Sequence, residues 1–152
     1  MSYAILLFIH LLAAAFWVGG MATLHFAVRP AAVATLEPPL RLRTMAAALR
    51  RFFVGVDAAV TLLFATGVAM ILFTGGFRAV HWPIEAMMGI ALVMAGIYVY
   101  IRASVFRAMR RAVEESAWPV AAARLNTVRL LVTVNLALGV AVFAVATIGR
   151  AG

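Results

Sequence analysis

The chain has 152 residues, of which 66% are hydrophobic and only 12% are charged. Soluble domains are typically about 45–50% apolar and about 25% charged, so this composition excludes a soluble globular enzyme, a disordered chain and a secreted disulfide scaffold. The chain contains no cysteine, which also excludes thiolate metal sites and cysteine nucleophiles. We therefore expect one integral membrane domain that covers residues 1–152.

Four apolar segments are each about long enough to cross a bilayer. They cover about residues 3–28, 52–74, 83–101 and 128–148. The first segment ends at Arg29-Pro30 and the third begins at Trp82-Pro83, where proline suits the first helical position. The first segment lacks a basic n-region and is longer than a signal-peptide core, so we expect it to remain as a helix. Because backbone groups in hydrocarbon must be paired within a segment, the sequence predicts an all-α bundle of four transmembrane helices.

The connections between the spans also carry helical patterns. Apolar residues recur at helical spacing between Leu40 and Phe53, which predicts that the second helix begins before the membrane. The segment from Arg107 to Glu115 can extend the third helix, and Trp118-Pro119 then turns the chain.

The 13 basic residues are all arginine and give a net charge of +8. Only Arg78 and Arg150 follow the second and fourth spans. The other eleven follow the first span, follow the third or open the fourth: Arg29, Arg41, Arg43, Arg50, Arg51, Arg102, Arg107, Arg110, Arg111, Arg124 and Arg129. By the positive-inside rule, both long connections are cytoplasmic and both termini lie outside, in an up-down-up-down arrangement. The charge therefore indicates orientation rather than nucleic-acid binding.

Few chemically active side chains lie within the spans, so each suggests a function. His10, Trp17, Met21 and His25 share one face of the first helix, because successive residues are about 100° apart. The two histidines are about 22 Å apart along the axis. This face, the His/Met stripe, covers most of the hydrocarbon thickness.

The depth of each residue suggests partners for the two histidines. Near the outer side, His10 could meet residues at the outer ends of the second and third helices: Met70, His81, Glu85, Met87 and Met88. Nearer the inner side, His25 lies close to the depth of Asp57, with Thr61, Arg129 and Asn135 as further candidates. Imidazole and thioether groups bind monovalent copper when thiolate is absent. The same groups can hold haem iron from its two faces, and buried carboxylates beside histidines can carry protons.

Structural roles compete with these interpretations. Methionine commonly fills apolar cores, and His81 beside Trp82 is typical of an interfacial pair. Asp57 could cap the start of the second helix or pair with an arginine. Asn135 is expected to form an interhelical hydrogen bond. His10 is the exception, because packing does not explain a histidine two turns into hydrocarbon with no carboxylate on its own helix.

The stretch from His10 through Trp17, Gly19 and Gly20 to Met21, closing at Val28-Arg29-Pro30, resembles the first helix of CopD-type copper resistance membrane proteins. Two further stretches resemble later helices of the same family: Arg51-Phe52-Phe53 followed by Ala65-Thr66-Gly67, and Arg124-Leu125-Asn126 followed by Asn135 to Gly139. The resemblance implies a multi-pass protein of the bacterial inner membrane, linked to copper resistance or uptake. It places the family's first-helix histidine on His10.

A weaker resemblance connects the first span to HemJ-type protoporphyrinogen oxidases. In both, a membrane histidine stands seven residues before a tryptophan and ten before a glycine, and this histidine again matches His10. That family carries haem b and has a lysine in a later motif, whereas this chain has no lysine. The departure argues against the oxidase activity but not against haem binding.

Three functions follow from the sequence. The first is copper binding, transport or resistance, with His10, Met21, His25, Met87 and Met88 as ligands. The second is a haem b protein with His10 as an axial ligand, and the third is an accessory membrane subunit without its own site. A homodimer or a membrane partner would supply the volume that a solute pathway needs. Phosphate-binding loops, nucleophile elbows and zinc-protease helices are absent from the sequence, so we expect no enzyme, apart from the haem-dependent oxidase.

Overall fold

The computed structural model describes residues 2–77 and 81–149, and four long helical rods make up almost all of this part of the chain. The first rod joins α1 (Ser2–Thr23), the π-helical turn η1 (Leu24–Val28) and α2 (Arg29–Thr35). The second rod is α3 (Pro38–Phe73). The third joins α4 (Trp82–Tyr100), the π-helical turn η3 (Ile101–Val105) and α5 (Phe106–Glu114), and the fourth is α6 (Trp118–Ile148). The predicted all-α fold with four membrane-length helices is confirmed.

The rods are longer than the apolar spans that the sequence marks. They contain 31 to 36 residues, or about 47–54 Å of helix, whereas the hydrocarbon layer is about 30 Å thick. The extensions of the second and third helices are confirmed by the starts and ends of α3 and α5. The fourth helix begins at Trp118 rather than near residue 128, because Pro119 fits its first turn and no glycine or proline interrupts the residues that follow.

The first helix does not end at Arg29-Pro30, as the sequence suggested. The backbone N–H of Arg29 bonds to the carbonyl of Leu24, one residue further back than in an α-helix. This wider turn precedes Pro30, whose ring would otherwise crowd the preceding turn of an α-helix. The rod therefore continues through Pro30 to Thr35.

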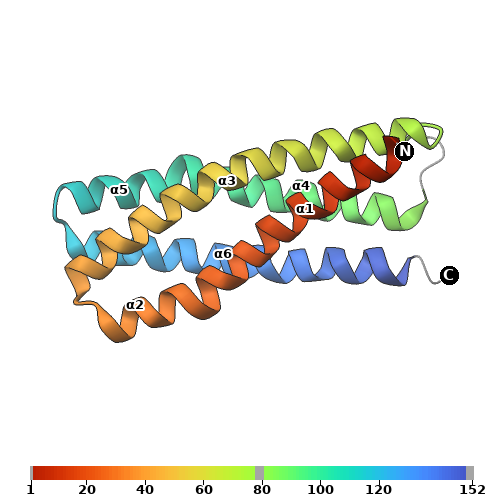
Figure 1. Ribbon diagram of the computed structural model, residues 1–152. Coiled ribbons are helices and arrows are strands. Elements are labelled where there is room, and N and C mark those ends of the chain that lie inside the picture. The colour runs from red at the N-terminus through yellow and green to blue at the C-terminus, as the bar shows by residue number, and fades with distance from the viewer. Residues whose placement is uncertain (1, 78–80, 150–152) are drawn as a thin grey trace.

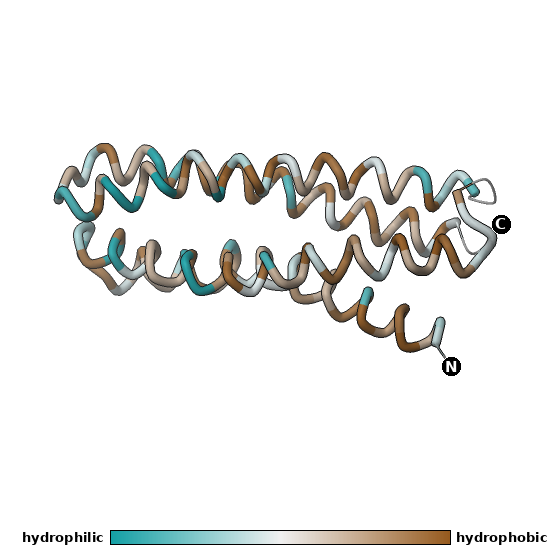
Figure 2. The backbone as a smooth tube through the Cα atoms, turned by 90° about the horizontal axis from the view of Figure 1, so that it is seen from above, coloured by the Kyte–Doolittle hydropathy of each residue, from teal (hydrophilic) through white to brown (hydrophobic). Residues whose placement is uncertain are grey.

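The rods run in alternating directions, so residues 2 and 149 lie at the same end of the bundle (Figure 1). Along the bundle α1 packs mainly against α3, and α4 and α5 pack against α6, while α1 and α6 share a smaller contact. The first turns of α1 lean away from the other helices (Figure 2). The bundle is thus two helix pairs that meet along a shared core.

That core is apolar and aromatic. The rings of Phe53, Tyr98 and Phe106 pack edge to face, with centroids 5.8 Å apart for Phe53 and Tyr98 and 5.0 Å apart for Phe53 and Phe106. Trp17 adds a fourth ring against Tyr98, at 6.0 Å. These rings come from α1, α3, α4 and α5, so they tie the two helix pairs together.

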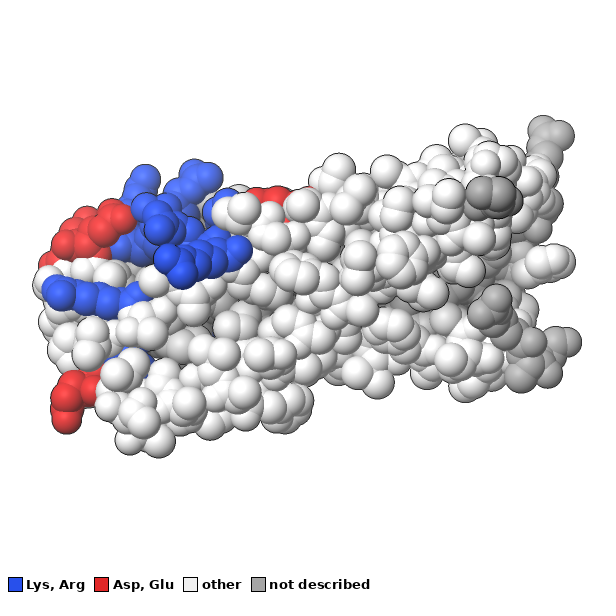
Figure 3. Space-filling model, viewed as in Figure 1, with Lys and Arg blue, Asp and Glu red and all other residues white. Residues whose placement is uncertain are grey.

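The charged side chains gather at one end of the molecule. Figure 3 shows the arginines over the end opposite residues 2 and 149, and Figure 2 shows that this end is also the more hydrophilic. We call it the arginine end and the other the terminal end. Arg78 and Arg150, which the sequence places at the terminal end, lie outside the described residues.

Candidate functional site: two histidines held by threonines

His10 lies on α1, about 12 Å of helix from Ser2. Its Nδ1 atom is 3.0 Å from the Oγ1 atom of Thr66 on α3. The imidazole also lies over Gly67, where an added Cβ atom would be 3.4 Å from the ring carbon Cε1. The ring is therefore partly enclosed between α1 and α3.

The contact with Thr66 favours one tautomer of His10. The hydroxyl of Thr66 already donates to the carbonyl of Leu62, 2.6 Å away on its own helix. Because a hydroxyl has one proton, a hydroxyl that donates to Leu62 accepts from His10, and in that arrangement Nδ1 is the donor. In the neutral ring Nε2 then keeps its lone pair. A histidine oriented through one nitrogen in this way can bind a metal through the other.

His25 is held by the same kind of contact at the other end of the rod. Its Nδ1 atom is 3.3 Å from the Oγ1 atom of Thr133 on α6, and Thr133 donates its own proton to the carbonyl of Arg129, 2.9 Å away. When Thr133 donates to that carbonyl, Nδ1 of His25 is again the donor, and Nε2 of the neutral ring again keeps its lone pair. His25 belongs to η1, and such π-helical turns are frequent at functional sites.

The surroundings of His25 differ from those of His10. A small cavity of about 30 Å³ beside His25 is lined by Arg29 and Arg129, and also by the thioether-bearing residue Met45. Both arginines border the cavity, and Arg129 is exposed; a nearby positive charge disfavours a bound cation, although water and salt screen it. Thus the two histidines share a hydrogen-bonding arrangement but not an electrostatic environment.

The remaining residues of the stripe between the histidines are part of the core. Trp17 and Met21 each expose 2% of their surface and pack within the main apolar cluster. His10 reaches α3 and His25 reaches α6, so the stripe crosses from one helix pair to the other. In this arrangement Met21 is packed among apolar side chains.

The outer residues of the third rod occupy separate positions. His81 and Glu85 are exposed at the start of α4, Met87 is half-buried, and Met88 is exposed. Within residues 2–77 and 81–149, no group of three histidine or acidic residues gathers as a metal cluster. Met70, near the end of α3, is also half-buried. The contact that His10 makes in the described residues is with α3 rather than α4.

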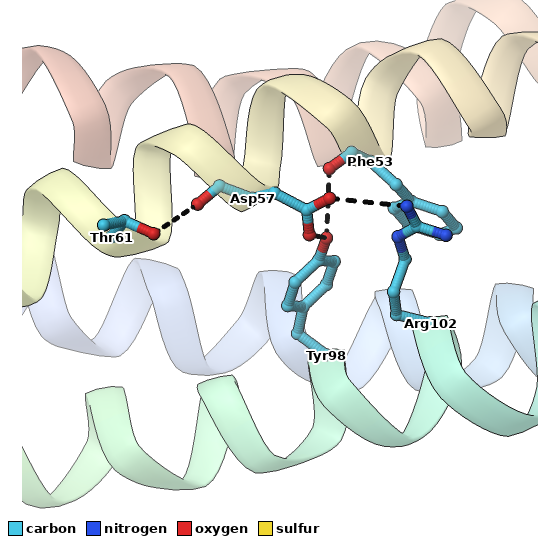
Figure 4. A network of polar contacts seen from close by, with 5 residues as sticks. All are labelled: Phe53, Asp57, Thr61, Tyr98 and Arg102. Atoms are coloured by element: carbon cyan, nitrogen blue, oxygen red, sulfur yellow. Dashed lines mark hydrogen bonds and ion pairs between the residues drawn. The ribbon is translucent and has the colours of Figure 1, made fainter.

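Asp57 joins a polar network near the arginine end (Figure 4). A carboxylate oxygen of Asp57 is 3.4 Å from a terminal nitrogen of Arg102 in η3. The hydroxyl of Tyr98 faces the other carboxylate oxygen and the carbonyl of Phe53, which is 3.0 Å away. The predicted pairing of Asp57 with an arginine is confirmed. The alternative that it caps the second helix is wrong, because α3 begins far upstream at Pro38.

Asn135 forms the interhelical hydrogen bond that the sequence predicted. It is buried at 1% exposure, and its Nδ2 atom donates to the carbonyl of Met94 at 3.1 Å. The bond joins α6 to α4 within the apolar core. It therefore serves the packing of this helix pair.

Three partners of the candidate residues were not predicted from the sequence: Thr66, Thr133 and Tyr98. Both threonines also bond to their own helices, so nothing in the one-dimensional pattern separates them from other helical threonines. The closest signal is Ala65-Thr66-Gly67, which was noted only as one of the stretches that resemble CopD-type proteins.

The family model of copper resistance protein D, CopD, matches residues 46–148, which is more than half of the chain. The chain belongs to the CopD family. Neither a curated protein nor a solved structure matches it at a significant level. The four long apolar helices and the family together make this a multi-pass membrane protein linked to copper resistance. The CopD match includes Thr66 and Thr133 but begins after α1, so His10 and His25 lie outside it.

Proposed function

We propose that this CopD protein binds monovalent copper within the membrane and that His10 is its principal ligand. The observation that carries the proposal is the 3.0 Å contact between Nδ1 of His10 and the hydroxyl of Thr66, which also lies 2.6 Å from the carbonyl of Leu62. A fixed imidazole with a free Nε2 lone pair is a suitable ligand for copper. The family supplies the link to copper, and the geometry supports a specific residue.

The distribution of charge also favours the terminal end of the bundle as the location of the copper site. The arginines gather at the opposite end (Figure 3). If the positive-inside rule holds here, the arginine end is cytoplasmic and His10 lies in the outer half of the membrane. A cation that arrives from outside would then reach His10 before it meets the guanidinium groups of the arginine end.

Thioether groups are the expected co-ligands of His10, although α1 shares little contact with α4, which carries Met87 and Met88. Met87 and Met88 lie in the terminal half of α4 and are both accessible, at least in part. Met21 and His25 continue the stripe towards the arginine end. We rank His25 as the weaker site because of Arg29 and Arg129 beside it. Spaced sites of moderate strength are what movement of an ion through a membrane protein requires.

The direct test is copper binding by purified protein in detergent, measured by competition with a chromogenic chelator specific for monovalent copper. We expect His10→Ala to weaken binding by at least about tenfold and His25→Ala to change it much less. The matched control is His81→Ala, which removes an exposed histidine. Equal binding by wild-type protein and a well-folded His10→Ala variant would refute the proposal.

An absorption spectrum of the same samples separates copper from haem b. A Soret band in wild-type protein that disappears in His10→Ala would show that His10 is a haem ligand. Wild-type protein that binds neither copper nor haem would instead support an accessory subunit. In that case Thr66 and His10 would form only a helix–helix contact.

A further inference from the structure

A second candidate site lies at the arginine end, on the side of the bundle where α3 meets the third rod. A cavity of about 380 Å³ is lined by six residues: Asp57, Arg102, Ala103, Phe106, Arg107 and Arg110. The five residues of the third rod lie on one face of η3 and α5, at positions that fall together at helical spacing. Figure 4 shows Asp57 and Arg102 extending towards each other across this junction.

The cavity carries an excess of positive charge. It contains three guanidinium groups and one carboxylate. The carboxylate of Asp57 is already engaged by Arg102 and by the hydroxyl of Tyr98, and Arg110 pairs with Glu114 at 3.1 Å. Among the described residues Arg107 takes part in no ion pair, and it is exposed. The cavity is therefore suited to an anion.

The depth of the cavity indicates where this anion comes from. Trp82, which is exposed and of a type enriched at membrane interfaces, begins the third rod. Arg102 lies about 30 Å further along the rod, which is about one hydrocarbon thickness. Arg107 and Arg110 lie beyond it, at the level of the lipid headgroups. Ala103, which is exposed, provides apolar surface at the boundary.

We propose that this cavity binds the phosphate headgroup of an anionic phospholipid in the leaflet at the arginine end. Guanidinium groups bind phosphate oxygens through paired hydrogen bonds, and basic cavities beside transmembrane helices on the cytoplasmic side are suited to acidic headgroups. The pair of Arg102 with Asp57 holds one guanidinium at the inner rim. Arg107 supplies the uncompensated charge further out, and Arg110, which is paired with Glu114, lies beside it. The proposal does not depend on copper binding.

The test uses the whole protein in a neutral detergent, titrated with short-chain phosphatidylglycerol or with phosphatidylcholine of the same chain length, while the midpoint of thermal unfolding is followed. We expect phosphatidylglycerol to raise the midpoint more than phosphatidylcholine does. Arg107→Gln should raise the half-saturating concentration about fivefold, as expected for one arginine near a lipid surface. The matched control is Arg111→Gln on the same helix, because Arg111 is exposed but does not line the cavity.

A second variant separates a shaped site from a general attraction between charges. Ala103→Leu fills the exposed floor of the cavity without changing its charge, and we expect it to weaken phosphatidylglycerol binding as Arg107→Gln does. Equal effects of the two lipids would overturn the proposal, as would equal losses in Arg107→Gln and Arg111→Gln. Inorganic phosphate is the third ligand in the titration. If phosphate stabilises the protein through Arg107 and phosphatidylglycerol does not, the site is for free phosphate and the lipid proposal is wrong.

Discussion

His10 and His25 belong to the same helical rod and form the same type of hydrogen bond, but they lie in opposite halves of the bundle. In each pair, Nδ1 lies within hydrogen-bonding distance of a threonine hydroxyl that also bonds to a carbonyl of its own helix. His10 rests over Gly67 in the terminal half, away from the arginines, whereas His25 lies beside Arg29 and Arg129. We infer from this difference that a threonine contact can orient each imidazole as a ligand, and that the nearby charge makes His10 the better site for a cation.

The packing of α1 against its neighbours explains why the two histidine–threonine pairs are separate. α1 packs mainly against α3 and only to a smaller extent against α6. His10 therefore meets Thr66 of α3, and His25 meets Thr133 of α6. Between them, Trp17 and Met21 are sealed in the core. Each histidine can thus be altered through its own threonine without changing the other contact.

The largest expected effect comes from removing these threonine hydroxyls. Thr66→Val keeps the shape of the side chain but leaves Nδ1 of His10 without its acceptor, so the ring loses its fixed orientation. Loss of such a supporting hydrogen bond typically weakens metal binding by about 10–100-fold. Thr133→Val makes the same change at His25 and should leave copper affinity within about twofold of wild type. Chelator competition measures both values.

The conservative variant Thr66→Ser provides the control for this comparison. It restores the acceptor, so copper affinity should return close to the wild-type value. A uniform loss in both valine variants would contradict the assignment of copper to His10. Unchanged affinity in Thr66→Val would mean that the hydrogen bond serves only to pack α1 against α3.

A smaller effect is expected from Gly67, which supports the ring of His10. A Cβ atom at this position would be 3.4 Å from the imidazole, which is an ordinary contact, so Gly67→Ala should bind copper nearly as well as wild type. Gly67→Leu requires more room than the ring leaves, and overpacking typically costs about 1–3 kcal/mol. We expect a loss of copper affinity of about tenfold if the ring must move.

Gly96→Leu is the matched control for that variant. Gly96 lies on α4, and a Cβ atom there meets nothing within 4 Å. It should change copper binding little. If Gly67→Leu and Gly96→Leu behaved alike, the ring of His10 would have no part in the site.

The sequence predicts the fold well where the signals are local. Hydropathy locates the four helices, and Pro83 marks the start of the third. The end of the first helix is predicted less well. The helix continues beyond Pro30 because of the π-helical turn, a change in backbone hydrogen bonding that the residue types do not predict. The start of the fourth helix at Trp118 is missed because the residues that follow it are too polar to read as a membrane span.

The candidate site is predicted only in part, for a physical reason. His10 and His25 are visible in the sequence because polar residues in hydrocarbon are costly. Their partners cannot be identified from the sequence. A threonine hydroxyl in a helix can bond to a carbonyl of its own helix, so its presence does not indicate a second contact. Which helix lies beside α1 depends on side-chain packing across the whole bundle. The pairing of α1 with α3 therefore had to come from the structure.

The smallest expected effect tests the electrostatic half of the comparison. The double variant Arg29→Gln and Arg129→Gln removes the charges of the two arginines that border the cavity beside His25. The carbonyl of residue 129 still accepts from Thr133, so the hydrogen bond that orients His25 is retained. Removing charges at this range is worth on the order of 1 kcal/mol for a cation. We therefore expect copper affinity at His25 to rise about fivefold, visible as a second, weaker equivalent in the titration.

Two further variants decide whether this gain belongs to His25. Adding His25→Ala to the double variant should abolish the second equivalent and leave the first, at His10, unchanged. Arg111→Gln with Arg124→Gln removes the same charge from exposed positions away from this cavity, and it should produce no second equivalent. If it did, the net charge of the protein rather than the local guanidinium groups would set copper affinity. In that case the local arginines would not explain why His25 binds copper more weakly than His10. The accessibility of the Nε2 lone pair of His25 would then be the next property to test.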